Sequence, residues 1–103
     1  MAIGLPSYHK ERRNLNIPKV EAKSKAIKAF EQMGCEEIGL HPFALDYNSL
    51  GSILTSGERI YVNITESEII IRSECIFITR IFDFGKNKAN VNQFWEAYDS
   101  IIL

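Results

Sequence analysis

Few side chains in this chain are of a type that binds metals or acts as a nucleophile, and their spacing fits neither role. They are two cysteines and two histidines, Cys35, Cys75, His9 and His41. A structural zinc site uses close pairs such as Cys-x₂-Cys or His-x₃₋₅-His, and these four residues form no such pair. A cysteine nucleophile needs an adjacent base, and no local motif supplies one. We therefore expect no metal, no cofactor and no enzymatic activity.

The segment 83–88 has two features that occur in phosphate chemistry. Asp83-Phe84-Gly85 spells the metal-binding triplet of protein kinases. That triplet works only with a glycine-rich loop, a strand lysine and a catalytic-loop aspartate, which a chain of 103 residues has no room for. Lys86 and Lys88 could hold an anion before a helix. With one glycine, a solvated loop is the simpler interpretation.

Charge is unevenly distributed along the chain. The net charge is −1, yet residues 1–30 carry seven basic and two acidic side chains. The densest basic cluster holds Lys10, Arg12 and Arg13, which could contact a phosphate backbone. Glu11 interrupts this run, so a solvated terminus is the simpler interpretation and nucleic-acid binding is an alternative.

The chain shows no targeting or membrane signal. Its first residues put their charge after a weakly apolar stretch, the reverse of a secretory signal. No apolar run approaches the ~20 residues of a transmembrane helix. Two cysteines without an export signal favour reduced thiols. These features predict a cytoplasmic protein with no membrane partner.

Two amphipathic helices are predicted. Pro18 suits the start of the first and Gly34 its end. The second covers residues 90–103, with Asn90 as its cap. Each helix has one apolar stripe. The stripes are Val20, Ile27, Phe30 and Met33 in the first helix, and Val91, Phe94, Trp95, Tyr98, Ile101 and Ile102 in the second.

The rest of the chain divides into an arm and a sheet. Residues 1–16 lack apolar periodicity and are predicted to form a basic N-terminal arm. Residues 17–103 form a single domain. Within it, residues 35–58 are punctuated by glycine and proline, and we expect one or two short strands there, around 43–47 and 52–54.

The strongest strand signal lies between residues 58 and 84, where β-branched and aromatic residues dominate. Two-residue loops at Glu66-Ser67 and Ser73-Glu74 would pair three strands. The predicted pairs are Ile64 with Ile69, Val62 with Ile71, Ile71 with Ile76, and Ile69 with Ile78. This register gives one apolar core face, made of Ile60, Val62, Ile64, Ile69, Ile71, Ile76, Ile78 and Phe82.

The opposite face of this predicted sheet is mixed rather than polar. Tyr61, Ile70, Phe77 and Ile81 form an apolar stripe, edged by Arg72, Asn63 and Thr79. Two short helices can cover only one face of a four- or five-stranded sheet. The second face is then covered by residues 38–55 or by another molecule, and an exposed apolar patch commonly marks a partner surface.

These observations predict an α+β fold: an N-terminal helix, an antiparallel four- to five-stranded meander sheet and a C-terminal helix, with both helices on one face. We expect a small non-enzymatic protein-interaction module. It self-associates, most simply as a homodimer, through an interface of Tyr61, Ile70, Arg72, Phe77 and Ile81. The alternative is single-stranded nucleic-acid binding, in which the sheet aromatics stack on bases and Lys10, Arg12 and Arg13 hold phosphates.

Overall fold

A computed structural model describes residues 8–49, 57–75 and 85–102. These ranges contain two helices and a five-stranded antiparallel sheet, which confirms the predicted α+β fold. The elements follow the order β1 (Tyr8–Asn14), α1 (Lys19–Met33), β2 (Glu36–His41), β3 (Ala44–Asn48), β4 (Glu58–Ile64), β5 (Glu68–Cys75) and α2 (Lys86–Ser100).

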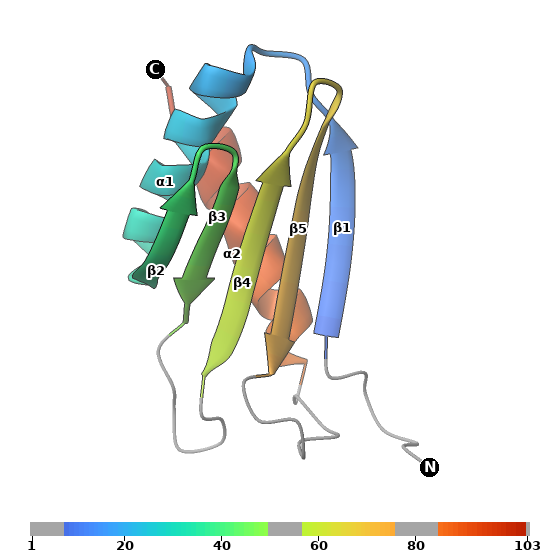
Figure 1. Ribbon diagram of the computed structural model, residues 1–103. Coiled ribbons are helices and arrows are strands. Elements are labelled where there is room, and N and C mark those ends of the chain that lie inside the picture. The colour runs from blue at the N-terminus through green and yellow to red at the C-terminus, as the bar shows by residue number, and fades with distance from the viewer. Residues whose placement is uncertain (1–7, 50–56, 76–84, 103) are drawn as a thin grey trace.

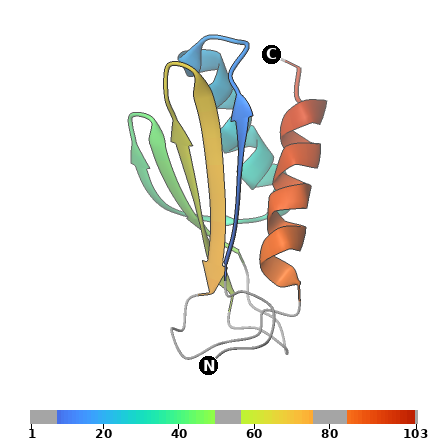
Figure 2. The same ribbon diagram turned by 90° about the vertical axis from the view of Figure 1, so that its right-hand side faces the viewer.

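The strand order across the sheet is β1-β5-β4-β3-β2. Strands β2 to β5 form a meander, and β1 pairs with the free edge of β5, so the first and second strands of the chain lie at opposite edges (Figure 1). Both helices lie on the same side of the sheet, as Figure 2 shows for α2. The molecule therefore has a covered face and an open face.

The β4–β5 hairpin has the predicted register. Ile64 pairs with Ile69 and Val62 pairs with Ile71. Beyond Ile64, the amide of Thr65 donates to the carbonyl of Glu68 over 2.8 Å, which leaves a two-residue loop. All four paired residues are buried, because the alternation of β-branched residues places them on the face that the helices cover.

The second predicted loop, at Ser73-Glu74, is wrong. Strand β5 continues through both residues to Cys75, and Ser73 is buried on the covered face. The partner on the far side of β5 is β1, so Ile71 pairs there with Glu11 rather than with Ile76. Ser73 and Glu74 do not end the strand, because neither residue type imposes a turn conformation on the backbone. Residues 76–84, which include the predicted partners of β5, lie outside the described residues.

The predicted basic arm is also wrong for residues 8–14, which form strand β1. This strand pairs with β5 over its whole length, from Tyr8 opposite Glu74 to Asn14 opposite Glu68. It has no buried residue, so it has no apolar periodicity to detect. Backbone hydrogen bonds to β5 and polar contacts to α2 hold it instead, so its removal should destabilise the fold.

The core lies between the two helices and the covered face. Helix α1 contributes Phe30 and three buried alanines, and the ring of Phe30 stacks on that of Tyr47 in β3 with centroids 4.0 Å apart. Because alanine side chains are small, helix α1 can pack closely against the rest of the core. Val20 is 67% exposed, so its predicted place in the stripe is wrong. Gly34 ends the helix at φ 75°, as predicted, in a conformation that favours glycine.

Helix α2 buries the aromatic stripe predicted for it, including Phe94, Trp95 and Tyr98. It begins earlier than predicted, after Gly85. Asn90 is therefore an internal, buried residue and not the cap. Ile101 is buried, but Ile102 is 93% exposed. Within the described ranges, neither helix is long and apolar enough to cross a membrane.

The segment expected to contain short strands forms β2 and β3, which widen the sheet instead of folding over it. A register shift between Glu37 and Gly39 marks a bulge in the edge strand β2, a feature that discourages further pairing at an edge. The expected strand at 52–54 lies outside the described residues.

Candidate interaction surface

The open face of the sheet is the candidate functional surface. Directly opposed residues of antiparallel strands point to the same face, so the strand register defines three rows that cross all five strands in the order β1, β5, β4, β3, β2. The first row is Tyr8, Glu74, Arg59, Asn48 and Glu36; the second is Lys10, Arg72, Tyr61, Asp46 and Gly39; the third is Arg12, Ile70, Asn63, Ala44 and His41.

The structure brings together three of the five residues predicted for the interface. Tyr61 lies opposite Arg72, and Ile70 lies opposite Asn63, all on the open face. The other two, Phe77 and Ile81, lie outside the described residues. Tyr61, Ile70 and Arg72 are all partly exposed. The described part of this face is more polar than the predicted apolar stripe.

Two of the three basic residues predicted to bind anions also lie on the open face. Lys10 stands opposite Arg72 and Arg12 opposite Ile70. Arg13 points to the covered side, where its guanidinium lies 4.0 Å from the centroid of the Trp95 ring and donates to Asp99 over 2.9 Å. Arg13 therefore attaches β1 to α2 and is not part of this surface.

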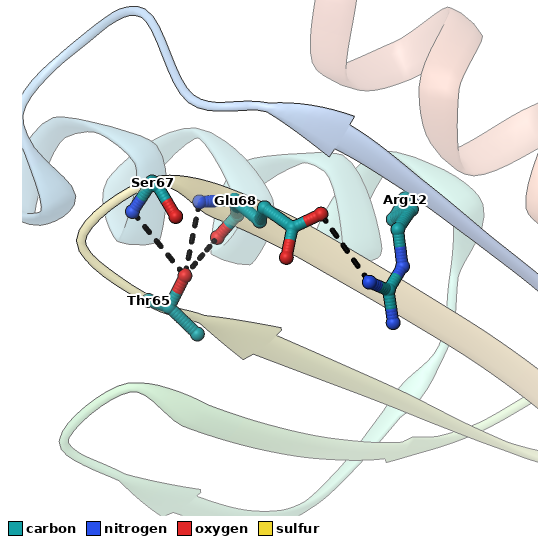
Figure 3. A network of polar contacts seen from close by, with 4 residues as sticks. All are labelled: Arg12, Thr65, Ser67 and Glu68. Carbon is teal, nitrogen blue, oxygen red and sulfur yellow. Dashed lines mark hydrogen bonds and ion pairs between the residues drawn. The ribbon is translucent and has the colours of Figure 1, made fainter.

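Arginines pair with acidic side chains on the open face. Arg72 donates to Glu74 over 2.8 Å, and Arg59 makes a two-point contact with Asp46. Arg12 lies 3.5 Å from Glu68 (Figure 3). Such exposed pairs each contribute ~0–1 kcal/mol to stability, but they fix the guanidinium groups in place. A face whose charges are already positioned loses less side-chain entropy on binding.

The turn from Thr65 to Glu68 joins β4 to β5 at one end of this surface, and side-chain hydrogen bonds fix its conformation. The hydroxyl of Thr65 accepts hydrogen bonds from the amides of Ser67 and Glu68 and donates to the Glu68 carbonyl (Figure 3). This side chain satisfies backbone groups in a loop whose residues, Glu66 and Ser67, are poor choices for a tight hairpin.

Aromatic residues accompany the arginines. The Arg72 guanidinium lies 4.2 Å from the centroid of the Tyr8 ring, and that of Arg59 lies 5.4 Å from the Tyr61 ring. Beside these pairs, a depression of about 410 Å³ crosses the second and third rows. Its lining runs from Lys10 on β1 to His41 on β2, with Tyr61 and Ile70 between them. The open face is thus hollowed rather than flat.

The sequence analysis missed several residues of this surface. Arg59 and Asp46 were not identified, although each stands two residues from an open-face residue on its own strand. The alternation in residues 44–48, with Leu45 and Tyr47 buried, was the available signal. Tyr8 could not be found in this way, because β1 has no apolar alternation.

A second polar cluster, the Glu58 network, lies inside the molecule where α2 crosses the sheet. Glu58 is fully buried. Its Oε1 accepts hydrogen bonds from Ser49 Oγ and Asn90 Nδ2, both at 2.8 Å. Asn90 also donates to Ser73 Oγ over 3.2 Å, and Ser73 donates to Asn87 over 2.8 Å. Glu58 stands in phase with Ile60 and Val62, so the alternation of β4 could have predicted its burial.

The Glu58 network links β3, β4 and β5 to α2 and fixes how the helix sits on the sheet. Glu58 Oε2 is buried and has no hydrogen-bond partner in the described part of the chain, which makes the network costly as well as specific. Because Glu58, Ser73, Asn87 and Asn90 are at most 2% exposed, a substrate does not reach them. We assign this cluster a structural role.

The cysteines and histidines give no sign of a reactive site in the described residues. Both cysteines are free thiols, and burial raises the pKa of Cys35 to about 11, which disfavours the nucleophilic thiolate. His9 hydrogen-bonds to Glu11 over 2.7 Å. No group of three or more candidate metal ligands occurs within residues 8–49, 57–75 and 85–102.

Comparisons with known proteins add no family to this description. The chain matches no protein-family model, and no curated protein sequence matches it.

Proposed function

We propose that this protein is a non-enzymatic interaction module that self-associates through the open face of its sheet. The observation that carries the proposal is the composition of that face: a tyrosine and an isoleucine lie at its middle, and arginines, a lysine and acids of both β3 and β5 surround them. Tyrosine and arginine are enriched at protein interfaces. A face that carries both signs of charge can complement a second copy of itself.

The location of the charges supports a protein partner over a polyanion. Glu74, Asp46 and Glu68 each pair with an arginine on this face. These acids would repel a phosphate backbone, whereas a protein surface of mixed charge can accommodate them. The expected compartment is still the cytoplasm, since two free thiols fit a reducing environment.

Mass in solution tests the proposal directly. Light scattering over a concentration series up to high micromolar is expected to give a multiple of the 11.8 kDa chain. Tyr61→Arg, which adds a charge to the middle of the face, is expected to give a folded monomer by circular dichroism. Val20→Arg is the matched control: it adds the same side chain at a position that is 67% exposed on α1, and it should leave the mass unchanged. A wild-type protein that stays monomeric would contradict the proposal.

Single-stranded nucleic-acid binding is the second candidate, and one observation favours it. The structure places Lys10 and Arg12 on the same face as Tyr61 and Arg72, so a stacking ring and phosphate-binding groups lie on one surface. A mobility shift with a single-stranded oligonucleotide that weakens with salt, and that Lys10→Ala with Arg12→Ala abolishes, would favour this function over self-association.

A further inference from the structure

The rows of the open face also determine how two copies can meet, if the proposed self-association holds. Two sheets that stack face to face lie ~10 Å apart with their strands within ~30° of each other. A two-fold axis between such sheets must run in their plane. Aligned strands then allow two directions for it: nearly parallel to the strands or nearly perpendicular to them.

An axis parallel to the strands exchanges the two sides of the sheet. In the order β1-β5-β4-β3-β2, the middle strand β4 faces itself, β5 faces β3 of the second copy, and β1 faces β2. Rows face their own counterparts, because the axis does not move them along the strands. Tyr61 then meets its own copy, and Ile70 meets Ala44.

The same axis matches charges in the second row. Arg72 on β5 faces Asp46 on β3 of the second copy, and the reverse contact forms by symmetry. Lys10 on β1 faces Gly39 on β2, where there is room for a long side chain. In the first row, Tyr8 faces Glu36, so its hydroxyl can donate to that carboxylate. Arg59 on β4 faces its own copy, and each of these guanidinium groups is already paired with Asp46 of its own chain.

An axis perpendicular to the strands through the second row brings more like charges together. Every strand then faces its own copy, so Lys10 meets Lys10, Arg72 meets Arg72 and Asp46 meets Asp46. Like charges that meet directly across an interface cost several kcal/mol. Ile70 would meet Glu74 instead of an apolar partner.

We propose that the chain forms a two-fold dimer whose axis runs parallel to the strands, with Arg72 of each copy against Asp46 of the other and Tyr61 on the axis. The interface is specified by the strand order itself, because that order puts Arg72 and Asp46 on the strands that flank β4 at equal distances.

Cross-linking of single-cysteine copies with a short bis-maleimide tests the direction of the axis, because this reagent spans the ~10 Å between facing sheets, which a disulfide cannot. The background variant is Cys35→Ala with Cys75→Ser, since the serine keeps an acceptor for Asn87, and its mass must equal that of the wild type. Copies with Arg72→Cys and copies with Asp46→Cys are mixed and cross-linked, and the product is identified by peptide mass. The expected product joins position 72 of one copy to position 46 of the other, and neither variant should cross-link to itself when it is treated alone.

Asn63→Cys is a second probe away from Tyr61: on β4 it faces its own copy when the axis is parallel to the strands, and it faces Arg59 when the axis is perpendicular. Self-linked Arg72→Cys and Asp46→Cys copies without the mixed product would overturn the parallel axis and leave self-association standing. A monomeric mass for the wild type would overturn both proposals.

Discussion

On the covered face of β4 and β5, the residues Ile60, Val62, Ile69 and Ile71 are buried beneath the helices. At the neighbouring positions of the same backbones, the open face carries Arg59, Tyr61, Ile70 and Arg72. Polar groups occur on both faces and are satisfied differently. On the covered face, the Glu58 carboxylate accepts hydrogen bonds from uncharged side chains. On the open face, carboxylates pair with arginines.

This difference shows what each face is able to do. A buried network excludes ligands and fixes one arrangement of α2 on the sheet, at the cost of a carboxylate oxygen that has no partner among the described residues. Exposed ion pairs contribute little to stability and stay accessible to a partner. Substitutions on the covered face should therefore change stability, and those on the open face should change association.

The largest effect on stability is expected from Trp95→Ala on the covered side. Trp95 is 4% exposed, and its indole nitrogen donates to Glu11 of β1 over 3.0 Å. Loss of a buried tryptophan side chain costs ~3–5 kcal/mol, a large share of the ~5–15 kcal/mol that stabilises a small domain. Denaturant unfolding followed by circular dichroism measures the loss. An unchanged midpoint would show that Trp95 does not belong to the core.

Glu58→Ala is expected to lower the free energy of unfolding by ~1–3 kcal/mol, because it removes the acceptor of two buried donors. The double variant Glu58→Leu with Asn90→Leu should lose less than the sum of the two single variants, since it removes both sides of a buried hydrogen bond. Denaturant titrations of the four proteins give the coupling, and strictly additive losses would contradict the network.

Arg13→Ala is expected to cost about 1 kcal/mol. The guanidinium stacks on Trp95 and pairs with Asp99, and these contacts fasten the edge strand β1 to α2. Arg12→Ala is the matched control, because Arg12 makes a single long contact with Glu68 on the open face. Equal melting temperatures for the two variants would mean that β1 is held by its backbone alone.

Acid pH gives a smaller effect. The hydrogen bond with His9 is the main reason that the pKa of Glu11 lies below its ordinary value of 4.5. A carboxyl whose pKa is lower in the folded state stabilises the fold above the unfolded pKa. That contribution is lost as the pH falls from about 4.5 through the folded pKa. The stability of Glu11→Gln should fall less between pH 5 and 3 in denaturant titrations, and parallel curves would contradict this.

The smallest effect on stability is expected from Tyr61→Ala, within ~0.5 kcal/mol for the isolated chain. Tyr61 is partly exposed and lies over no core residue on its own face. Its effect should instead be seen in the mass in solution. A loss comparable to that of Trp95→Ala at low protein concentration would show that the two faces are not distinct.

Features that depend on the burial of apolar side chains, or on the special conformation of glycine, could be predicted from the sequence. The α2 stripe, the β4–β5 register and the glycine end of α1 all follow from side chains that must avoid water or from a conformation that only glycine adopts readily. The placement of Tyr61, Ile70 and Arg72 on one face followed from the same alternation.

The pairing of β1 with β5 and the extension of β5 to Cys75 are visible in the three-dimensional structure alone. A β-ladder is made by backbone groups that every residue but proline carries in full, so a polar segment such as residues 8–14 can complete a sheet without an apolar pattern. Where such a segment pairs depends on which strand has a free edge, and here β1 pairs with the free edge of β5. That choice moved Lys10 and Arg12 onto the face of Tyr61 and Arg13 onto α2, because side chains on neighbouring positions of a strand point to opposite faces.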